Sequence, residues 1–305
     1  MANSKYAYVR NFELPDPLLP GTFMLLRLDG HSFHRFSDKH QFSRPNDVRA
    51  LQLMDHAAKA VMEEYPDIVL AFGESDEFSF LLRKSTTLYN RRQSKIVSTL
   101  TSLFTSCYVF HWPKYFPDTP LQYPPSFDGR IVLYPTEKHV RDYFAWRQAD
   151  THINNLYNTT FWALVQQGGQ TTTEAHAALR GSFSKEKHEI LFSRFGINYN
   201  GIDARYRKGS VLFREEIYEK GRNPSVGREL SILEKPQPKT EEKTAPSVRD
   251  EPQGETLPAE GATRDQKAKK VKEKRKQLLP SRIAIQHCDI IKDEFWDARP
   301  DILAE

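Results

Sequence analysis

The sequence predicts an α+β fold, a palm-like (ferredoxin-like) mixed sheet with helices packed on one of its faces. Hydrophobic periodicity near the amino terminus gives the order strand, helix, strand, strand, helix, which is typical of such a sheet. Two of the apolar runs also end on a carboxylate, at Asp29 and at Asp76. With 305 residues, of which 38% are hydrophobic, the chain is long enough to bury a sizeable core.

The strands are predicted from short apolar runs that are rich in β-branched and aromatic residues. The segment from Gly73 to Asp76 is a turn signal, so the runs on either side of it are expected to pair as a hairpin. The predicted strands are 22–29, 68–72, 77–82, 130–134 and 208–217.

The helices are predicted from apolar residues that recur at helical spacing between start and stop signals. Pro66 ends the first helix, the second ends before Pro113, and the pair Gly168–Gly169 ends the third. Thr136 is the expected N-cap of the third helix. The predicted helices are 48–65, 90–111, 137–165, 173–180 and 185–195.

Composition divides the chain into four regions. Residues 1–135 form the palm region that carries the chemistry, and residues 136–233 form a helical region that completes the same domain. Large apolar residues nearly vanish between residues 234 and 280, so this charged insertion is expected to be disordered. Apolar and aromatic residues return in residues 281–305, which are expected to dock on the core.

Charge and cysteine content narrow the function classes. Residues 264–276 carry eight Lys/Arg and two Asp/Glu, and the rest of the chain is close to neutral, so nucleic-acid binding by the folded part must rely on local clusters.

No run of 18 apolar residues is present, so no transmembrane helix is expected, and the N-terminus lacks the apolar core of a secretory signal. Two distant cysteines, Cys107 and Cys288, form neither a disulfide framework nor a zinc pair and indicate an intracellular, reducing compartment.

The two strand-end carboxylates predict a magnesium site. Adjacent strands that end in Asp29 and Asp76 would form a cup of hard oxygen ligands, and the Gly30 carbonyl can add a third. Two Mg²⁺ ions about 3.5–4 Å apart serve phosphoryl and nucleotidyl transfer. Glu77 is expected to face the opposite side of its strand, which makes it a weaker ligand. The alternative is that each Asp only caps a turn.

Polar residues around this pair are candidates for nucleotide binding. The segment from Asp29 to His34 could present successive backbone N–H groups to a triphosphate, and Ser75 could add a hydroxyl. His31 and His34 are too isolated for a zinc site; they could touch a phosphate or a base, or be structural. Four cations near the acidic turns, or on the helix that follows, could neutralise a triphosphate or form a solvated helix face. They are Arg27, Arg91, Arg92 and Lys95.

Two further polar sets fall in the region 136–233. The first lies inside an otherwise apolar helix, so it indicates either a wet surface that touches substrate or a set of caps for neighbouring loops. Its members are Asp150, His152, Asn154, Asn155 and Asn158. The second combines cations with Tyr199 and Tyr206, as in surfaces that bind single-stranded RNA. Its members are Lys187, Asn198, Arg205, Arg207 and Lys208.

Four segments together resemble the tRNA-histidine guanylyltransferase family: RLDGHSFHRFS, FGESDEFSF, RQADTHINNLYNTTFWAL and HCDIIKDEFW. The resemblance covers nearly everything outside the charged insertion, which it leaves without a counterpart. It implies a palm fold and a nucleotidyltransferase that adds a guanosine to the 5′ end of histidine tRNA. The tRNA 5′-phosphate would first be activated with ATP or GTP, after which the 3′-hydroxyl of GTP attacks it.

The resemblance also implies residue roles. The ligands of two Mg²⁺ ions would be Asp29, Gly30 and Asp76, and the catalytic residues would be Asp29, Asp76 and Glu77. The residues that bind GTP and ATP would be Asp29, Gly30, His31, Ser32, Phe33, His34, Ser75, Asp76, Arg92 and Lys95. By the same resemblance, His152 and Asn155 would position the tRNA 5′ end. The polar-basic pattern described above, and not the resemblance, suggests that Lys187, Asn198, Arg207 and Lys208 contact the anticodon.

The resemblance implies a homotetramer, with an interface formed by exposed aromatic residues in the stretch 108–123. No membrane partner is expected, and the cytoplasm is the expected compartment, with nuclear and mitochondrial pools left open. Two other functions stay open. One is a palm-type nucleotide cyclase that acts on GTP, because GESDEF loosely resembles a cyclase metal hairpin. The other is a catalytically inactive tRNA-binding protein, which would have no need of both carboxylates.

Overall fold

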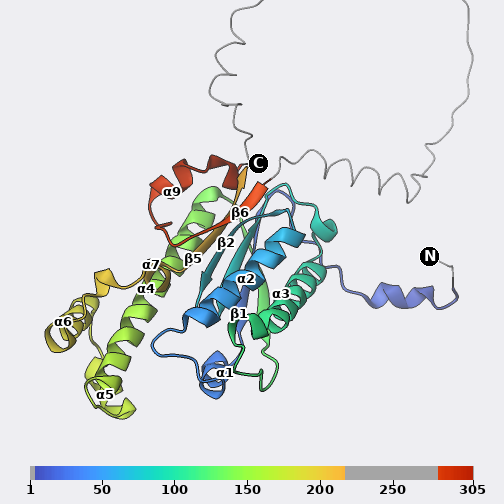
Figure 1. Ribbon diagram of the computed structural model, residues 1–305. Helices are drawn as coiled ribbons and strands as arrows, with labels where there is room; N and C mark the ends of the chain where they lie inside the picture. Colours follow the sequence, from blue (N-terminus) through green and yellow to red (C-terminus); the bar gives the residue numbers. More distant parts are fainter. Residues whose placement is uncertain (1–3, 217–280, 305) are drawn as a thin grey trace, which may run out of the picture. The chain divides into compact units, whose positions relative to one another are not determined.

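A six-stranded β-sheet forms the centre of the computed structural model, which describes residues 4–216 and 281–304 (Figure 1). The strands follow the order β4-β1-β3-β2-β5-β6 across the sheet. Their bounds are β1 (Phe23–Gly30), β2 (Ile68–Glu74), β3 (Glu77–Leu82), β4 (Phe127–Tyr134), β5 (Ser210–Glu216) and β6 (Ser281–Gln286). The predicted charged insertion, residues 234–280, lies outside the described residues.

The order β4-β1-β3-β2, with helices between β1 and β2 and between β3 and β4, is the βαββαβ arrangement of ferredoxin-like and palm folds. The predicted α+β class is therefore confirmed. A mixed sheet was expected, with both parallel and antiparallel pairs. In the structure, the pairings of β1 with β3 and β4, and of β2 with β3 and β5, are all antiparallel. The strands β1 and β2 run parallel to each other, but β3 lies between them.

Helices cover both faces of the sheet, whereas the sequence predicted one covered face (Figure 1). On β1, Met24 and Leu26 pack against α2 and α3, while Leu25 on the opposite face packs with α4 and the C-terminal segment. The α-helices are α1 (Phe33–Lys39), α2 (Val48–Glu64), α3 (Gln93–Tyr115), α4 (Glu137–Gln166), α5 (Thr172–Leu179), α6 (Ser184–Phe195), α7 (Ala204–Lys208) and α9 (Asp293–Asp297). The 3₁₀ helices are η1 (Ala7–Phe12), η2 (Leu88–Arg91), η3 (Tyr199–Gly201) and η4 (Pro300–Ile302). Within residues 4–216 and 281–304, none of the helices has the length and apolar character needed to cross a bilayer.

Helix α3 continues through Pro113 to Tyr115, although the sequence predicted that it ends before this proline. The rings of Trp112 and Phe116 stack with 4.2 Å between their centroids, and the Trp112 carbonyl accepts the Phe116 N–H. This packing holds the last turn in place even though Pro113 has no backbone N–H to donate.

Three of the aromatic residues expected to be exposed in the stretch 108–123 are instead buried. Tyr108, Trp112 and Phe116 are at most 2% exposed and belong to the core between the sheet and helices α2 and α3. Phe110 is 78% exposed, because it lies on the solvent side of the same helix. Tyr108, Trp112 and Phe116 are therefore not available for the expected interface, whereas Phe110 is exposed.

The C-terminal residues from Ile283 onward belong to the same compact unit as the described residues up to Arg214. Gln148 on α4 binds this segment, donating to the Cys288 carbonyl at 2.9 Å and accepting the Ile290 N–H at 2.8 Å. Trp296 is buried in the core on the α4 face of the sheet. Helix α4 is thereby fixed over the strand ends that carry the acidic residues.

Candidate active site

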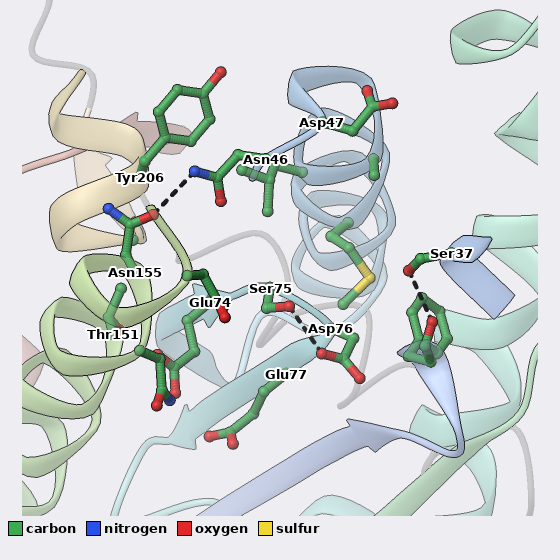
Figure 2. Close-up of a pocket in the computed structure, with 18 of the residues that line it drawn as sticks. Ser37, Asn46, Asp47, Glu74, Ser75, Asp76, Glu77, Thr151, Asn155 and Tyr206 are labelled. Carbon is green, nitrogen blue, oxygen red and sulfur yellow. Dashed lines mark hydrogen bonds between the residues drawn. The ribbon is translucent and has the colours of Figure 1, made fainter. Parts of the chain in front are cut away.

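A cavity of about 550 Å³ opens where β1 ends and the chain turns from β2 into β3 (Figure 2). Asp29, at the end of β1, and Asp76, in the turn, both line it. Residues of α1, α2, α4 and α7 supply the remaining walls. The structure thus brings together the two carboxylates that stand about 45 residues apart in the chain.

Backbone contacts hold the β2–β3 turn against the end of β1. Ser75 has φ 49°, in the left-handed region, which allows the chain to reverse within two residues. The Gly30 N–H donates to the Asp76 carbonyl at 3.1 Å, and the Ser75 hydroxyl donates to the Asp76 carboxylate at 2.9 Å (Figure 2). A Cβ atom on Gly30 would lie 2.3 Å from the Phe33 ring and 2.8 Å from Asp76 Oδ2. Only glycine therefore fits at this position without displacing a cavity residue.

Glu77 lies directly opposite Asp29 in the register of β1 and β3. Its carboxylate accepts hydrogen bonds from Arg27 at 2.5 Å and from Arg147 on α4 at 3.0 Å. Figure 2 shows the side chains of Asp76 and Glu77 pointing in different directions from neighbouring positions. Glu77 thus belongs to a cluster of ion pairs in the cavity wall, whereas Asp76 points in another direction and forms no ion pair within the described residues.

Burial raises the pKa of the carboxyl groups in this region. It raises the pKa of Asp76 to about 6; the charges of Asp29 and Glu77 add to the rise, and the hydrogen bond from Ser75 opposes it. Burial likewise raises the pKa of Glu74 to about 7. The pKa of Glu77 is raised by burial despite its contacts with Arg147 and Arg27. A bound cation would stabilise the ionised form of Asp76, so the cavity is electrostatically suited to a metal ion.

The oxygen ligands at the cavity fit Mg²⁺. The carboxylates of Asp29 and Asp76, which line the cavity, are hard donors of the kind that this ion prefers, and the carbonyl of Gly30, the residue after Asp29, is a donor of the same kind. In the described parts of the chain, no group of three or more His, Cys, Asp or Glu side chains is arranged so that it could hold a metal ion. Mg²⁺ commonly takes one or two carboxylates and completes its shell with waters and substrate phosphates, so the sparse set is compatible with it.

Two of the residues predicted to bind nucleotide, Phe33 and His34, lie at the start of α1 and line the cavity. His31 and Ser32 are exposed in the turn before this helix. The His31 N–H is donated to the Ser126 carbonyl at 2.9 Å. The expected row of free backbone N–H groups is therefore shorter than the segment from Asp29 to His34, because two of its amides already bind the protein.

Arg92 and Lys95 lie away from the cavity of their own chain. Arg92 pairs with Asp16 at 2.9 Å, and Lys95 is exposed in the first turn of α3. The preceding residue, Arg91, donates to the Thr22 carbonyl, just before β1 begins. This corner is separated from Asp29 by the length of β1, an eight-residue strand that rises about 3.3 Å per residue. Of the two positions expected for Arg92 and Lys95, the structure therefore places them at the start of the helix that follows the turns and not beside the acidic turns.

The residues predicted to contact tRNA fall into two groups. Asn155 lines the cavity, accepts a hydrogen bond from Asn46 at 2.9 Å and donates one to the Tyr199 hydroxyl at 3.0 Å. His152 packs edge-on against Tyr199, with 5.4 Å between the ring centroids.

The other four predicted tRNA contacts are not among the cavity-lining residues of the described chain. Each has a local partner that fixes its orientation. They are Lys187 (Ser182 carbonyl), Asn198 (Asn200 N–H), Arg207 (Ile202 carbonyl) and Lys208 (Asp289 carboxylate). These four residues are available for a second surface rather than for the cavity.

Asn155→Ala is expected to lower the free energy of unfolding by about 1–3 kcal/mol, because it leaves Asn46 and the buried Tyr199 hydroxyl without their partner. Asn154→Ala, at the exposed neighbouring position, is the control and should change stability by less than about 0.5 kcal/mol. Urea denaturation of both variants measures the difference. Equal costs would show that the two hydrogen bonds of Asn155 contribute nothing to stability.

Sequence reasoning assigned no role to Glu74 or Arg147, and both line the cavity. A signal for Arg147 is present in the chain. It falls on the same stripe of α4 as Val140, Phe144 and Thr151, all of which are buried. A charged residue at a core-facing position of an amphipathic helix requires a buried partner of opposite charge, and the structure supplies Glu77.

Comparison with known proteins gives consistent matches along the chain. The family model described as tRNAHis guanylyltransferase matches residues 6–135, and the model described as Thg1 C terminal domain matches residues 138–292. The tRNA(His) guanylyltransferase of Neurospora crassa is 49% identical, covering 100% of this chain and 97% of its own length. That of Schizosaccharomyces pombe is 48% identical, covering 98% and 97% respectively.

The structural comparison agrees with these matches. The crystal structure of tRNA(His) guanylyltransferase from Saccharomyces cerevisiae has a TM-score of 0.66 at 50% identity, covering 68% of this chain and 93% of its own. The earlier resemblance and the predicted enzyme class, a nucleotidyltransferase, are confirmed. The two family models and the relatives that match over nearly their whole length establish that the chain belongs to the tRNAHis guanylyltransferase family.

Proposed function

We propose that this protein adds a guanosine to the 5′ end of histidine tRNA, in a nucleotidyl transfer that uses two Mg²⁺ ions and follows activation of the tRNA 5′-phosphate with ATP or GTP. The observation that supports it most directly is the placement of Asp29 and Asp76 at one cavity of about 550 Å³. The printed names of the relatives, tRNA(His) guanylyltransferases, support the choice of substrate.

The side chains of the cavity would divide the work between metal and phosphate. Asp29, Asp76 and the Gly30 carbonyl would hold two Mg²⁺ ions, which when bound neutralise phosphate charge and lower the pKa of an attacking hydroxyl. Ser75 and His34 lie where they can hydrogen-bond to phosphate oxygens. Arg44 and Arg205 line the cavity as well and offer cations to the same oxygens.

The tRNA would approach from the α4 side. His152 and Asn155 would position its 5′ end, since Asn155 lies at the cavity wall and His152 lies one turn earlier on the same helix. The four residues with local partners, Lys187, Asn198, Arg207 and Lys208, would form the surface for the anticodon. Arg92 and Lys95 would reach a nucleotide only outside their own chain's cavity, for example in a neighbouring copy.

The test is the transfer of labelled GTP to histidine tRNA that lacks the additional 5′ nucleotide, with ATP and Mg²⁺ present. A tRNA with a swapped anticodon is the control, and it should accept little label. Incubation with GTP alone addresses the cyclase alternative, and a cyclic nucleotide product would exclude the proposed reaction. Binding of tRNA without any transfer would instead favour an inactive tRNA-binding protein.

Gly30→Ala is expected to lower the transfer rate at least about fivefold, because overpacking of this kind costs about 1–3 kcal/mol and here displaces either Phe33 or Asp76. Gly201→Ala is the matched control, since a Cβ atom at Gly201 meets nothing within 4 Å. Labelled-GTP transfer by both variants measures the effect. Wild-type activity of Gly30→Ala would mean that the close approach of Asp76 to the end of β1 is dispensable.

A homotetramer is part of the same proposal. The exposed Phe110 on α3 is one apolar residue available for a contact between copies. Phe110→Asp should shift the sedimentation coefficient to that of a smaller species if this surface joins two subunits, and an unchanged value would remove this surface from the interface. The cytoplasmic compartment stays a prediction.

A further inference from the structure

The guanidinium group of Arg27 lies next to Asp29, a carboxylate that is proposed to hold Mg²⁺. A cation in this position would compete with the metal ion for the carboxylate, so its presence needs an explanation. Arg27 lies two residues before Asp29 on β1, so both side chains share one face of the sheet. Its Nη2 lies 2.6 Å from Asp29 Oδ2. The same nitrogen lies 2.5 Å from Glu77 Oε2 on the neighbouring strand. Arg27 therefore bridges two carboxylates.

Glu77 is itself held from two sides. Its Oε2 atom accepts from Arg27 at 2.5 Å and from Arg147 Nη1 at 3.0 Å, and its Oε1 atom lies 3.3 Å from the same Arg147 nitrogen. The side chains of Glu77 and Arg147 are only 10% and 4% exposed. With both oxygens engaged in charge-assisted hydrogen bonds, Glu77 is not free to bind a metal ion.

We propose that Glu77 is a positioning residue, which holds Arg27 in place so that Arg27 fixes one oxygen of Asp29 and leaves the other for Mg²⁺. The contacts form one chain of alternating charge, Arg147–Glu77–Arg27–Asp29, from helix α4 to the end of β1. At the α4 end of this chain, Arg147 also pairs with Glu74 at 3.6 Å and with Asp150 at 3.4 Å. This inference rests on the proposed function, because it takes Asp29 as a metal ligand.

The alternative is that the network acts only through its electric field, or that Arg27 serves to bind the triphosphate. Variants that conserve charge but change geometry separate these accounts. Arg27→Lys keeps the cation but changes the length and shape of the side chain that places one nitrogen, Nη2, between Asp29 and Glu77. Glu77→Asp keeps the anion on a side chain that is one methylene shorter. Arg130→Lys is the matched control, because Arg130 is the register partner of Arg27 on β4 and pairs with Asp128 instead.

The experiment measures Mn²⁺ binding to the free, full-length protein by calorimetry, and then the Mg²⁺ concentration that gives half-maximal GTP transfer. Arg27→Lys and Glu77→Asp are each expected to weaken Mn²⁺ binding about tenfold, as for other partners that orient a metal ligand. The half-maximal Mg²⁺ concentration should rise by a similar factor, and KM for GTP at saturating Mg²⁺ should stay within about twofold of wild type. The double variant should bind Mn²⁺ with the same affinity as the single variant that binds it less tightly, because both substitutions break the same chain of contacts.

Three outcomes would overturn the inference. Mn²⁺ affinity unchanged in both variants would reduce the network to a structural role, and a raised KM for GTP with unchanged Mn²⁺ affinity would assign Arg27 to the triphosphate. Complete loss of Mn²⁺ binding in Glu77→Asp, equal to that of Asp76→Asn, would make Glu77 a ligand. Thermal unfolding of each variant checks that it is folded. If Glu77→Asp does not fold, the Mn²⁺ affinity of Arg27→Lys alone tests the inference.

Failure of the proposed function gives a different pattern. If Asp76→Asn binds Mn²⁺ as well as wild type and still transfers GTP, the metal site itself is misplaced. If Asp76→Asn loses Mn²⁺ while Arg27→Lys and Glu77→Asp do not, only the positioning role of Glu77 is refuted.

Discussion

Asp76→Asn is expected to lower the rate of GTP transfer to histidine tRNA at least about a hundredfold, because the Mg²⁺ that Asp76 is proposed to hold would stabilise transition-state charge by several kcal/mol. The substitution removes a charge but hardly changes the shape of the side chain. Affinity for tRNA should change little, since the predicted tRNA contacts lie on α4, α6 and near α7. Single-turnover transfer and a filter-binding assay with the same tRNA separate the two effects.

The same variant should be at least as stable as the wild type in metal-free buffer at pH 8. The pKa of Asp76 is raised by burial to about 6, so the folded protein holds this proton more tightly than the unfolded chain does. The contribution of Asp76 to stability therefore falls as pH rises from its unfolded pKa of about 4 through about 6. Asn has no proton to lose, so the variant should show a flatter pH profile in urea denaturation.

Asp142→Asn is the control, because Asp142 is an exposed carboxylate on α4 that pairs with Lys138 outside the cavity. Its activity should equal that of the wild type. Retention of more than about a tenth of the activity by Asp76→Asn would contradict the metal assignment, whatever its effect on stability.

Arg147→Met is expected to lower the free energy of unfolding by about 3–5 kcal/mol, the usual cost of removing one partner from a buried ion pair. Arg147 is 4% exposed and lies 3.0 Å from Glu77, 3.6 Å from Glu74 and 3.4 Å from Asp150. Without it, the carboxyl groups of Glu74 and Glu77, each 10% exposed, lie close together with little solvent. The cost should be smaller at pH 5 than at pH 8, because Glu74, with a pKa of about 7, then carries a proton.

Arg130→Met is the matched control, since Arg130 pairs with Asp128 at the surface. The side chain of Arg130 is 55% exposed and that of Asp128 is 57% exposed. A surface pair of this kind contributes about 0–1 kcal/mol. Urea denaturation of both variants at the two pH values gives the comparison. A cost for Arg147→Met that matched the control would mean that water reaches the cluster and screens its charges.

Local patterns were sufficient to predict several elements closely. The strand predicted at 77–82 is β3, and the helix predicted at 48–65 differs from α2 by one residue at its end. Both have strong periodicity and clear stop signals, which depend only on neighbours in the chain. The end of α3 was predicted less well, because stacking of Trp112 on Phe116, a contact with the core, outweighs the local preference of Pro113.

The candidate site divides in the same way. Asp29 and Asp76 were found because each ends or follows an apolar run, and in an antiparallel arrangement of β1 and β3 those positions meet. The partnership of Arg147 with Glu77 joins residues 70 positions apart, and no local pattern encodes which helix will cover which strand. The sequence left open whether Arg92 and Lys95 lie near the acidic turns or only on the helix that follows, because proximity in sequence to a turn does not give the direction in which a strand carries the chain.

Three features of the protein could be predicted from the sequence alone: the palm-type class, the choice of Asp29 and Asp76 as the candidate site, and the family. Each of them depends on short motifs and on periodicity along the chain. The tertiary structure decided which of the two neighbouring carboxylates, Asp76 or Glu77, is enclosed by arginines. That choice depends on side chains brought together from β1, β3 and α4, and burial then sets the charge each can carry.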